Sequence, residues 1–322
     1  MTKPPLVDLV GVGLNATDTL IPLATFPERG SKVQFTQASV QPGGQAATTV
    51  LACQLWGLAT RYVGKLGDDP AAQLHRDAFQ RAGVDARLVT VPHTASAQSV
   101  ILVDEGGERT VLNQRNPRIQ LTPADLQREW ITQARALHVD GLEIAAATLA
   151  ASWARQAGIP TIADLDELYP GVEDLIANID YLIVSRDFPS ALTGERDLQQ
   201  ALRALMRSFR CSVTAATLGN EGVLAWDGER FHLRPAYQVP VADTTGAGDI
   251  FHAGFIYGLL HGWPLPRSLD FACADAALNC TAQGARGHIA PVTEIESLMA
   301  TAPRYAIATT SSQSHVTAAR FD

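Results

Sequence analysis

Residues 243–249 form the run Asp243-Thr244-Thr245-Gly246-Ala247-Gly248-Asp249, which leads into an apolar stretch that ends near residue 260. The two glycines let the backbone turn tightly, so several N–H groups face one point at a helix N-terminus, where the dipole favours negative charge. Such a turn binds anions. Asp249 would then act as a general base toward a hydroxyl while the turn stabilises a phosphoryl group in transfer. By residue types alone, a packing turn with Asp249 as a helix-capping acid fits equally well.

A second glycine pattern lies near the N-terminus. Gly11, Gly13 and Ala16 fit the G-x-G-x-x-A turn of dinucleotide-binding folds, directly after an apolar run. That turn must open a helix, yet Pro22 and Pro27 interrupt the segment that follows. No acidic residue ends a second strand at the expected distance either, so the sequence argues against a dehydrogenase.

The elements that must position the 243–249 run alternate between strand and helix. Strands followed by helices of 10–15 residues are typical of a parallel sheet covered on both faces, which predicts an α/β fold. The expected strands are 6–12, 61–64, 136–139, 161–163, 181–184 and 213–217, and the expected helices are 46–58, 70–82, 247–260 and 266–282.

Two distant segments, 15–42 and 94–115, break this alternation and are predicted to form a small β-sheet lid. Residues 31–36 alternate polar and apolar side chains, as a half-exposed strand does, while 99–103 and 109–112 flank a glycine-containing turn. Ligands of parallel α/β sheets bind at the carboxyl ends of the strands, so an insertion there would cover the ligand.

Composition narrows the function classes. The 322 residues include 25 Lys and Arg against 33 Asp and Glu, a net charge of −8, which disfavours nucleic-acid or membrane-surface partners. The four cysteines have no zinc or disulfide spacing, and no long apolar segment or signal peptide is visible. We expect a cytoplasmic protein with one domain over 1–300 and a loosely ordered tail over 301–322.

The 243–249 run closely resembles the C-terminal signature of the ribokinase-like (PfkB-type) carbohydrate kinases, and the resemblance extends over about residues 6–292. Asp18 matches an early aspartate of the family, Gly43-Gly44 matches its N-terminal signature, and Gly64-Lys65-Leu66-Gly67-Asp68-Asp69 matches a further G-x-x-G-D-D stretch. The resemblance implies a ribokinase-like fold and transfer of the γ-phosphate of ATP, as its Mg²⁺ complex, to a hydroxyl of a sugar or sugar derivative.

The resemblance also implies roles for individual residues. Asp249 is implied as the catalytic base, and Gly246, Ala247 and Gly248 as the anion hole. The implied substrate contacts are Asp18, Gly43, Gly44, Thr48, Lys32 and Asn113, and the implied nucleotide contacts are Thr217, Gly219, Gly222, Thr244 and Gly284. Some members are activated by a monovalent cation such as K⁺ near the positions of Asp243 and Thr245.

The chain departs from the family pattern at several positions. Thr48 stands where the family usually has Asn after the diglycine, and Ser185 with Phe188 replaces the N-x-x-E motif near Mg²⁺, so the Mg²⁺ ligands stay unassigned. These variants resemble a subgroup that includes sulfofructose kinases, in which residues at the positions of Lys32 and Asn113 hold an anionic substrate. Glu143, where that subgroup has an arginine, would repel an anion.

Two other functions stay open. A nucleoside kinase would share the signature, but its lid would need aromatic residues to stack on a base, and the lid here offers only Phe26 and Phe35. A non-catalytic sensor of sugar or ATP would tolerate the altered N-x-x-E motif, although Asp249 and the glycines of the turn are intact. Because lid strands with an exposed face commonly need cover, we expect a homodimer joined through the lids.

Overall fold

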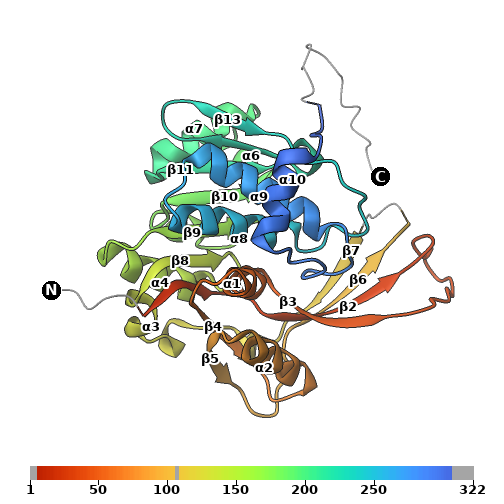
Figure 1. Cartoon of the computed structure of the whole chain (residues 1–322). Helices are drawn as coiled ribbons and strands as arrows, with labels where there is room; N and C mark the ends of the chain where they lie inside the picture. The colour runs from red at the N-terminus through yellow and green to blue at the C-terminus, as the bar shows by residue number, and fades with distance from the viewer. Residues whose placement is uncertain (1–5, 106–108, 307–322) are drawn as a thin grey trace.

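The computed structural model describes residues 6–105 and 109–306. Within them, one large sheet has nine strands in the order β13-β12-β11-β10-β9-β8-β1-β4-β5, and only the pairs β11–β12 and β12–β13 are antiparallel (Figure 1). The strands are β1 (Val7–Val12), β4 (Thr60–Leu66), β5 (Asp85–Thr90), β8 (Ala134–Asp140), β9 (Thr161–Leu165), β10 (Tyr181–Ser185), β11 (Val213–Thr217), β12 (Val223–Trp226) and β13 (Phe231–Arg234).

Helices cover both faces of this sheet, and a separate hydrophobic core fills each interface. One face carries α1 (Gln45–Leu55), α2 (Pro70–Ala82), α8 (Ala247–Leu260), α9 (Leu265–Asn279) and α10 (Val292–Thr301). The other carries α3 (Arg128–Thr132), α4 (Ile144–Gln156), α5 (Val172–Ile176), α6 (Phe188–Thr193) and α7 (Leu198–Phe209). The expected α/β fold with a mostly parallel central sheet is confirmed.

Local sequence explains where these elements begin and end. Helix α2 starts at Pro70 behind Asp69, whose side chain accepts a hydrogen bond from Ala72 N at 3.0 Å, and it stops at Gly83 with φ 78°. Strands β8 to β11 are buried on both faces, which is why they appear as continuous apolar runs.

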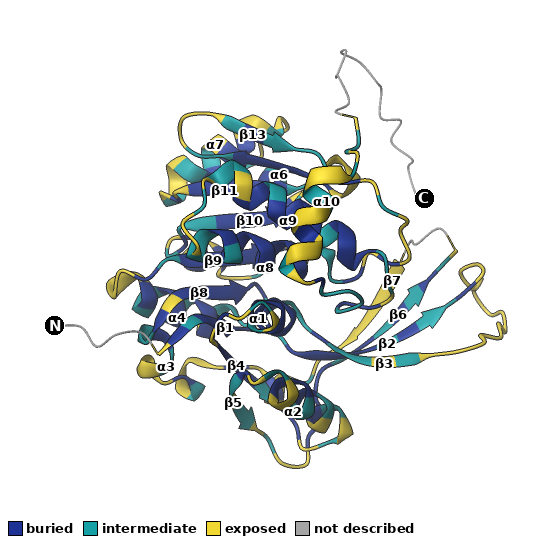
Figure 2. Cartoon of the chain, in the orientation of Figure 1, coloured by how far each residue is buried: buried dark blue, intermediate teal, exposed yellow. Residues whose placement is uncertain are grey.

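The lid is a four-stranded sheet that projects from the large sheet (Figure 1). Its order is β3 (Ser39–Gly43), β2 (Ala16–Pro22), β6 (Gln98–Val103) and β7 (Arg109–Gln114). Every residue of β7 is exposed, as Figure 2 shows in yellow. The strand beginning at Ala16 also excludes the helix that a dinucleotide-binding turn would require.

The prediction of a strand at 31–36 is wrong. Residues 23–38 contain no strand, and β2 pairs instead with 39–43, in a register that joins Leu20 to Ser39. Strand β2 ends at Pro22, which offers no backbone N–H to extend the ladder, so nothing is left for 31–36 to pair with.

The segment after α10 runs back along the body of the protein up to residue 306. An isolated bridge joins Arg304 to Tyr237, and Gln238 N donates to Pro303 O at 2.9 Å. The rest of the tail expected at 301–322 lies outside the described residues. None of the helices in the described part of the chain is long and apolar enough to cross a membrane.

Candidate active site

The carboxyl ends of the parallel strands meet at one edge of the large sheet, beside the lid. Strand β1 lies between β4 and β8, and the strands that follow along the chain are added on both sides of β1, so the strand order reverses at this point. A crevice at such a switch point is the usual ligand site of open α/β sheets. Asp140 ends β8, Thr217 ends β11 and Gly246 is the N-cap of α8, and their side chains and backbone groups line this edge.

Asp249 lies in the first turn of α8 and is 9% exposed. Thr49 of α1 fixes its backbone, because the Thr49 hydroxyl donates to Asp249 O at 2.9 Å. Burial and the neighbouring Asp164 carboxyl raise the pKa of Asp249 well above its usual range. A carboxylate with a raised pKa is better matched to removing a proton near neutral pH.

The turn before Asp249 depends on its glycines. Gly246 has φ 74°, the left-handed region that favours glycine, and a Cβ there would lie 2.3 Å from Ala285 O. The Ala247 N–H donates to Thr244 O at 3.3 Å. The N–H groups of Gly248 and Asp249, at the helix start, have no acceptor in the part of the chain that the structure describes, as expected for an open anion site.

Asp18 of β2 is 6% exposed and faces the same crevice from the lid. Burial raises its pKa to about 6, against the lowering effects of the Ser99 hydroxyl and the Arg286 charge. Ser99 Oγ lies 3.0 Å from Asn113 Oδ1, so one hydroxyl connects Asn113 to the surroundings of Asp18. A Cβ on Gly43 would lie 2.0 Å from Asp18 Oδ2, so only glycine fits there.

The sequence analysis missed Arg286. Its guanidinium reaches across the base of the lid, where Nε donates to Thr48 Oγ1 at 3.1 Å and Nη2 donates to Gly43 O at 3.3 Å. Nη1 is buried with no partner among the described residues. The Asp249 and Asp18 carboxylates favour its charge, although burial lowers its pKa to about 10. Thr48, expected as a substrate contact, therefore holds this arginine.

Behind Asp249 lies a buried pair that the sequence did not indicate. Asp164 of β9 lies 3.4 Å from His252 Nδ1, and His252 Nδ1 also contacts Gly248 O at 2.9 Å. Burial lowers the pKa of His252 and raises that of Asp164. His252, on the turn of α8 after Asp249, thus connects α8 to the end of β9.

A pocket of about 230 Å³ opens on the other side of the turn. It brings together four of the five predicted nucleotide contacts, and Gly248 of the turn also lines it. Most of its remaining wall is apolar, as suits a flat heterocycle. The four contacts are Thr217, Gly219, Gly222 and Thr244, and the fifth, Gly284, donates its N–H to Asp243 Oδ2 at 2.8 Å.

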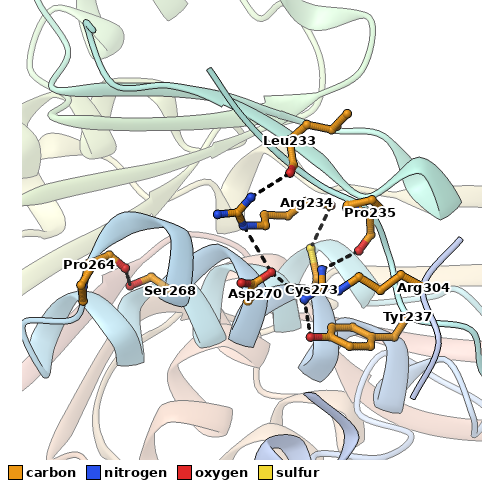
Figure 3. Close-up of polar contacts among 9 residues, drawn as sticks. All are labelled: Leu233, Arg234, Pro235, Tyr237, Pro264, Ser268, Asp270, Cys273 and Arg304. Carbon is orange, nitrogen blue, oxygen red and sulfur yellow. Dashed lines mark hydrogen bonds and ion pairs between the residues drawn. The ribbon is translucent and has the colours of Figure 1, made fainter. Parts of the chain in front are cut away.

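Arg304 makes several polar contacts with residues beside this pocket, as Figure 3 shows. Its Nη1 donates to Pro235 O at 2.9 Å and its Nη2 to Asp270 Oδ1 at 2.6 Å, while Nη2 also bonds the Tyr237 hydroxyl. Tyr237 and Tyr305 both line the pocket. The segment after α10 is therefore part of the site. No local sequence signal indicated this role for the segment.

The remaining predicted residues are less central. Lys32 lies in the exposed loop 23–38, and within the described residues it makes no hydrogen bond or ion pair with the site. Glu143 lines a neighbouring cavity of about 200 Å³ together with Lys65 and Arg115. Burial raises the pKa of Glu143 to about 8, so this group carries little negative charge near neutral pH.

The donors available for Mg²⁺ are carboxylates at the end of β9. After burial, the neighbouring Asp166 charge is the next cause that raises the pKa of Asp164, and Ser185 Oγ donates to Asp166 O at 2.9 Å. Across residues 6–105 and 109–306, no cluster of three His, Cys, Asp or Glu side chains could hold a metal by itself. Mg²⁺ is commonly bound through one or two carboxylates, water and substrate phosphates, and these residues fit that mode.

Comparison with known proteins gives a consistent answer. The profile described as pfkB family carbohydrate kinase matches residues 10–291. An ATP-dependent ribose-1-phosphate kinase of Halopiger xanaduensis is 26% identical over 87% of this chain and 94% of its own length. An aminoimidazole riboside kinase of Salmonella typhimurium is 30% identical over 76% of this chain and 83% of its own length.

Solved structures agree on the fold. The ribokinase of Thermotoga maritima superposes with a TM-score of 0.79 at 21% identity, covering 92% of this chain and all of that one. The signature at 243–249, the pocket beside it and the family match over most of the chain lead to one assignment. This protein belongs to the pfkB family of carbohydrate kinases, which are ATP-dependent phosphotransferases.

Proposed function

We propose that the protein phosphorylates a sugar hydroxyl with Asp249 as the base. The observation that supports this most directly is the position of Asp249, whose charge acts on Arg286 as that of Asp18 does and whose neighbour Gly248 lines the apolar pocket. Asp18 accepts hydrogen bonds from sugar hydroxyls and so aligns one of them with the Asp249 carboxylate. The free N–H groups at the start of α8 neutralise charge on the phosphoryl group as it transfers.

Mg²⁺ fits the carboxylates of Asp164 and Asp166. When bound, it supplies positive charge to the phosphates of ATP. The protein itself contributes the alignment of the hydroxyl, the removal of its proton by Asp249 and the anion hole, while the lid excludes water from the closed site.

The acceptor is a sugar rather than a nucleoside on the evidence of the lid. Phe26 and Phe35, its aromatic side chains, lie in the exposed loop 23–38, and they are 37% and 53% exposed. A base-stacking platform would bury at least one ring. A relative named aminoimidazole riboside kinase keeps nucleoside-like acceptors among the compounds to be tested.

The test is a coupled assay of ADP release with Mg-ATP and a panel of pentoses, hexoses, ketoses, sugar acids, sulfosugars and nucleosides. Asp249→Asn serves as the catalytic variant, and Asn178→Ala, at a half-buried asparagine away from the crevice, as the matched control. We expect turnover on one sugar class that is lost in Asp249→Asn and kept in the control. Turnover that survives in Asp249→Asn would refute the assigned base.

We propose further that two copies join through their lids in the cytoplasm. The lid exposes apolar side chains on both of its edge strands, Val40 on β3 and Val111 and Leu112 on β7, at 41–60% exposure. All four cysteines are buried free thiols, as suits a reducing compartment. Light scattering should give twice the chain mass, and Leu112→Glu should give the monomer. A wild-type monomer at micromolar concentration would contradict the dimer.

A further inference from the structure

The turn that carries the anion hole begins at Asp243, which is fully buried. Its carboxylate accepts three hydrogen bonds within the protein. Oδ1 accepts from Thr245 N at 2.9 Å and from Thr245 Oγ1 at 2.7 Å, and Oδ2 accepts from Gly284 N at 2.8 Å. Most of the acceptor capacity of this carboxylate is therefore used without any cation.

The carbonyl of Thr245 also has a partner. Asn279, the last residue of α9, is fully buried, and its Nδ2 donates to Thr245 O at 3.1 Å. The Oδ1 of the same side chain accepts from His288 N at 3.2 Å. A carbonyl oxygen only accepts and a backbone N–H only donates, so these two partners fix which end of the amide faces which loop.

These contacts do not fit a monovalent cation beside Asp243 and Thr245. Proteins bind K⁺ through oxygen atoms that replace its hydration shell. Here the group directed at the Thr245 carbonyl is an NH₂, which presents hydrogens and carries no lone pair for a cation. The same amide already joins the 243–249 turn to the loop that contains Gly284 and His288.

We propose that the Asn279 side chain takes the place of the monovalent cation in this protein and makes its activity independent of K⁺. Asn279 is then a positioning residue. It holds the Thr245 carbonyl on one side and the 284–288 loop on the other, so the turn before Asp249 keeps its shape. The inference rests on the proposed function for its kinetic readout, whereas its thermal readout stands by itself.

The experiment compares KCl, NaCl and tetramethylammonium chloride at equal ionic strength. For the wild type, we expect equal rates and equal melting temperatures in all three salts. A cation that bound the native state specifically would raise the melting temperature with its concentration. A K⁺-specific rise in the rate or the melting temperature of the wild type would overturn the proposal.

Asn279→Asp supplies the matched variant, because it has the same shape but directs an oxygen at the Thr245 carbonyl. In tetramethylammonium chloride we expect its kcat to fall about tenfold, the effect of losing one buried hydrogen bond to the turn. K⁺ should then restore part of the rate and raise its melting temperature. Asn279→Ala should also lose rate, and Asn178→Ala should not. An Asn279→Asp protein that keeps the wild-type rate in every salt would refute the positioning role.

If the wild type turns over no compound in the panel, the proposed function fails, and the melting temperatures still decide the question of the cation. A salt-independent wild type together with an Asn279→Asp protein stabilised specifically by K⁺ would support the inference. Absence of K⁺ stabilisation in Asn279→Asp would count against it.

Discussion

Replacing Gly248 by alanine should separate stability from catalysis. Gly248 is the second residue of α8, and a Cβ built there meets no atom within 4 Å. Alanine is favoured over glycine within a helix by roughly 0.5–1 kcal/mol, so the folded protein should gain stability. For a chain of this size we expect the melting temperature to rise by about 1–3 °C.

The same methyl group should reduce catalysis. Gly248 lines the nucleotide pocket, and the open space beside it is where a transferring phosphoryl group would lie against the helix N-terminus. Disturbing one anion-hole donor typically lowers kcat by about 10²–10³-fold, or roughly 3–4 kcal/mol. Gly248→Ala should therefore be at least as stable as the wild type and far less active.

Gly246→Ala is the contrasting variant. Its alanine would need a left-handed φ of 74° and would place Cβ 2.3 Å from Ala285 O and 2.5 Å from Ala285 Cα. The conformation alone costs about 1–2 kcal/mol, so melting temperature and kcat should fall together. Both quantities come from thermal melts and the coupled assay. Wild-type kcat in Gly248→Ala, or a loss of its stability that matches its loss of activity, would refute this account of the turn.

Three further predictions concern charge. Arg286→Met should raise the KM for the sugar, and Arg286→Lys should restore only part of the wild-type affinity, because Arg286 bonds both Thr48 and the Gly43 carbonyl. Wild-type kinetics in Arg286→Met would contradict this prediction. Asp18 has a pKa of about 6, which the Arg286 charge lowers, so kcat/KM at saturating Mg-ATP should fall as the pH drops through 6. In Arg286→Met that fall should begin at a higher pH. A pH profile of kcat/KM that is the same in both proteins would exclude an effect of Arg286 on the pKa of Asp18. Burial raises the pKa of Glu143 to about 8 from 4.5, so between these pH values the native state keeps a proton that the unfolded chain has lost, and the free energy of unfolding should decrease as the pH rises. In denaturant titrations, Glu143→Gln should make the free energy of unfolding less dependent on pH. The same pH dependence in both proteins would count against this prediction.

Much of the fold was predictable from local sequence. The strand and helix alternation follows from periodicity within ten to fifteen residues, and the helix from Pro70 to Ala82 carries its own start and stop signals. The prediction of a strand at 31–36 was wrong because the alternation of polar and apolar residues is a local pattern. Strand formation also needs a partner ladder, and β2 ends at Pro22 before it could supply one.

Part of the candidate site was likewise predictable from local sequence, and part of it was not. The run from Asp243 to Asp249 predicted a glycine turn at a helix start followed by an acid, because glycine freedom and a helix start are properties of adjacent residues. No local signal could reveal Arg286, since its partner Thr48 lies 238 residues away along the chain.

By itself, the sequence determined the α/β class, the glycine turn and the acid that follows it, because each depends on backbone preferences and on periodicities of a few residues. Only the tertiary structure decided that Arg304 would contact residues beside the nucleotide pocket and that the Asn279 amide would face the Thr245 carbonyl. The physical reason is that a side chain's hydrogen-bond partner is set by which distant segments the packed cores bring together. Residue type specifies only what that side chain can donate or accept.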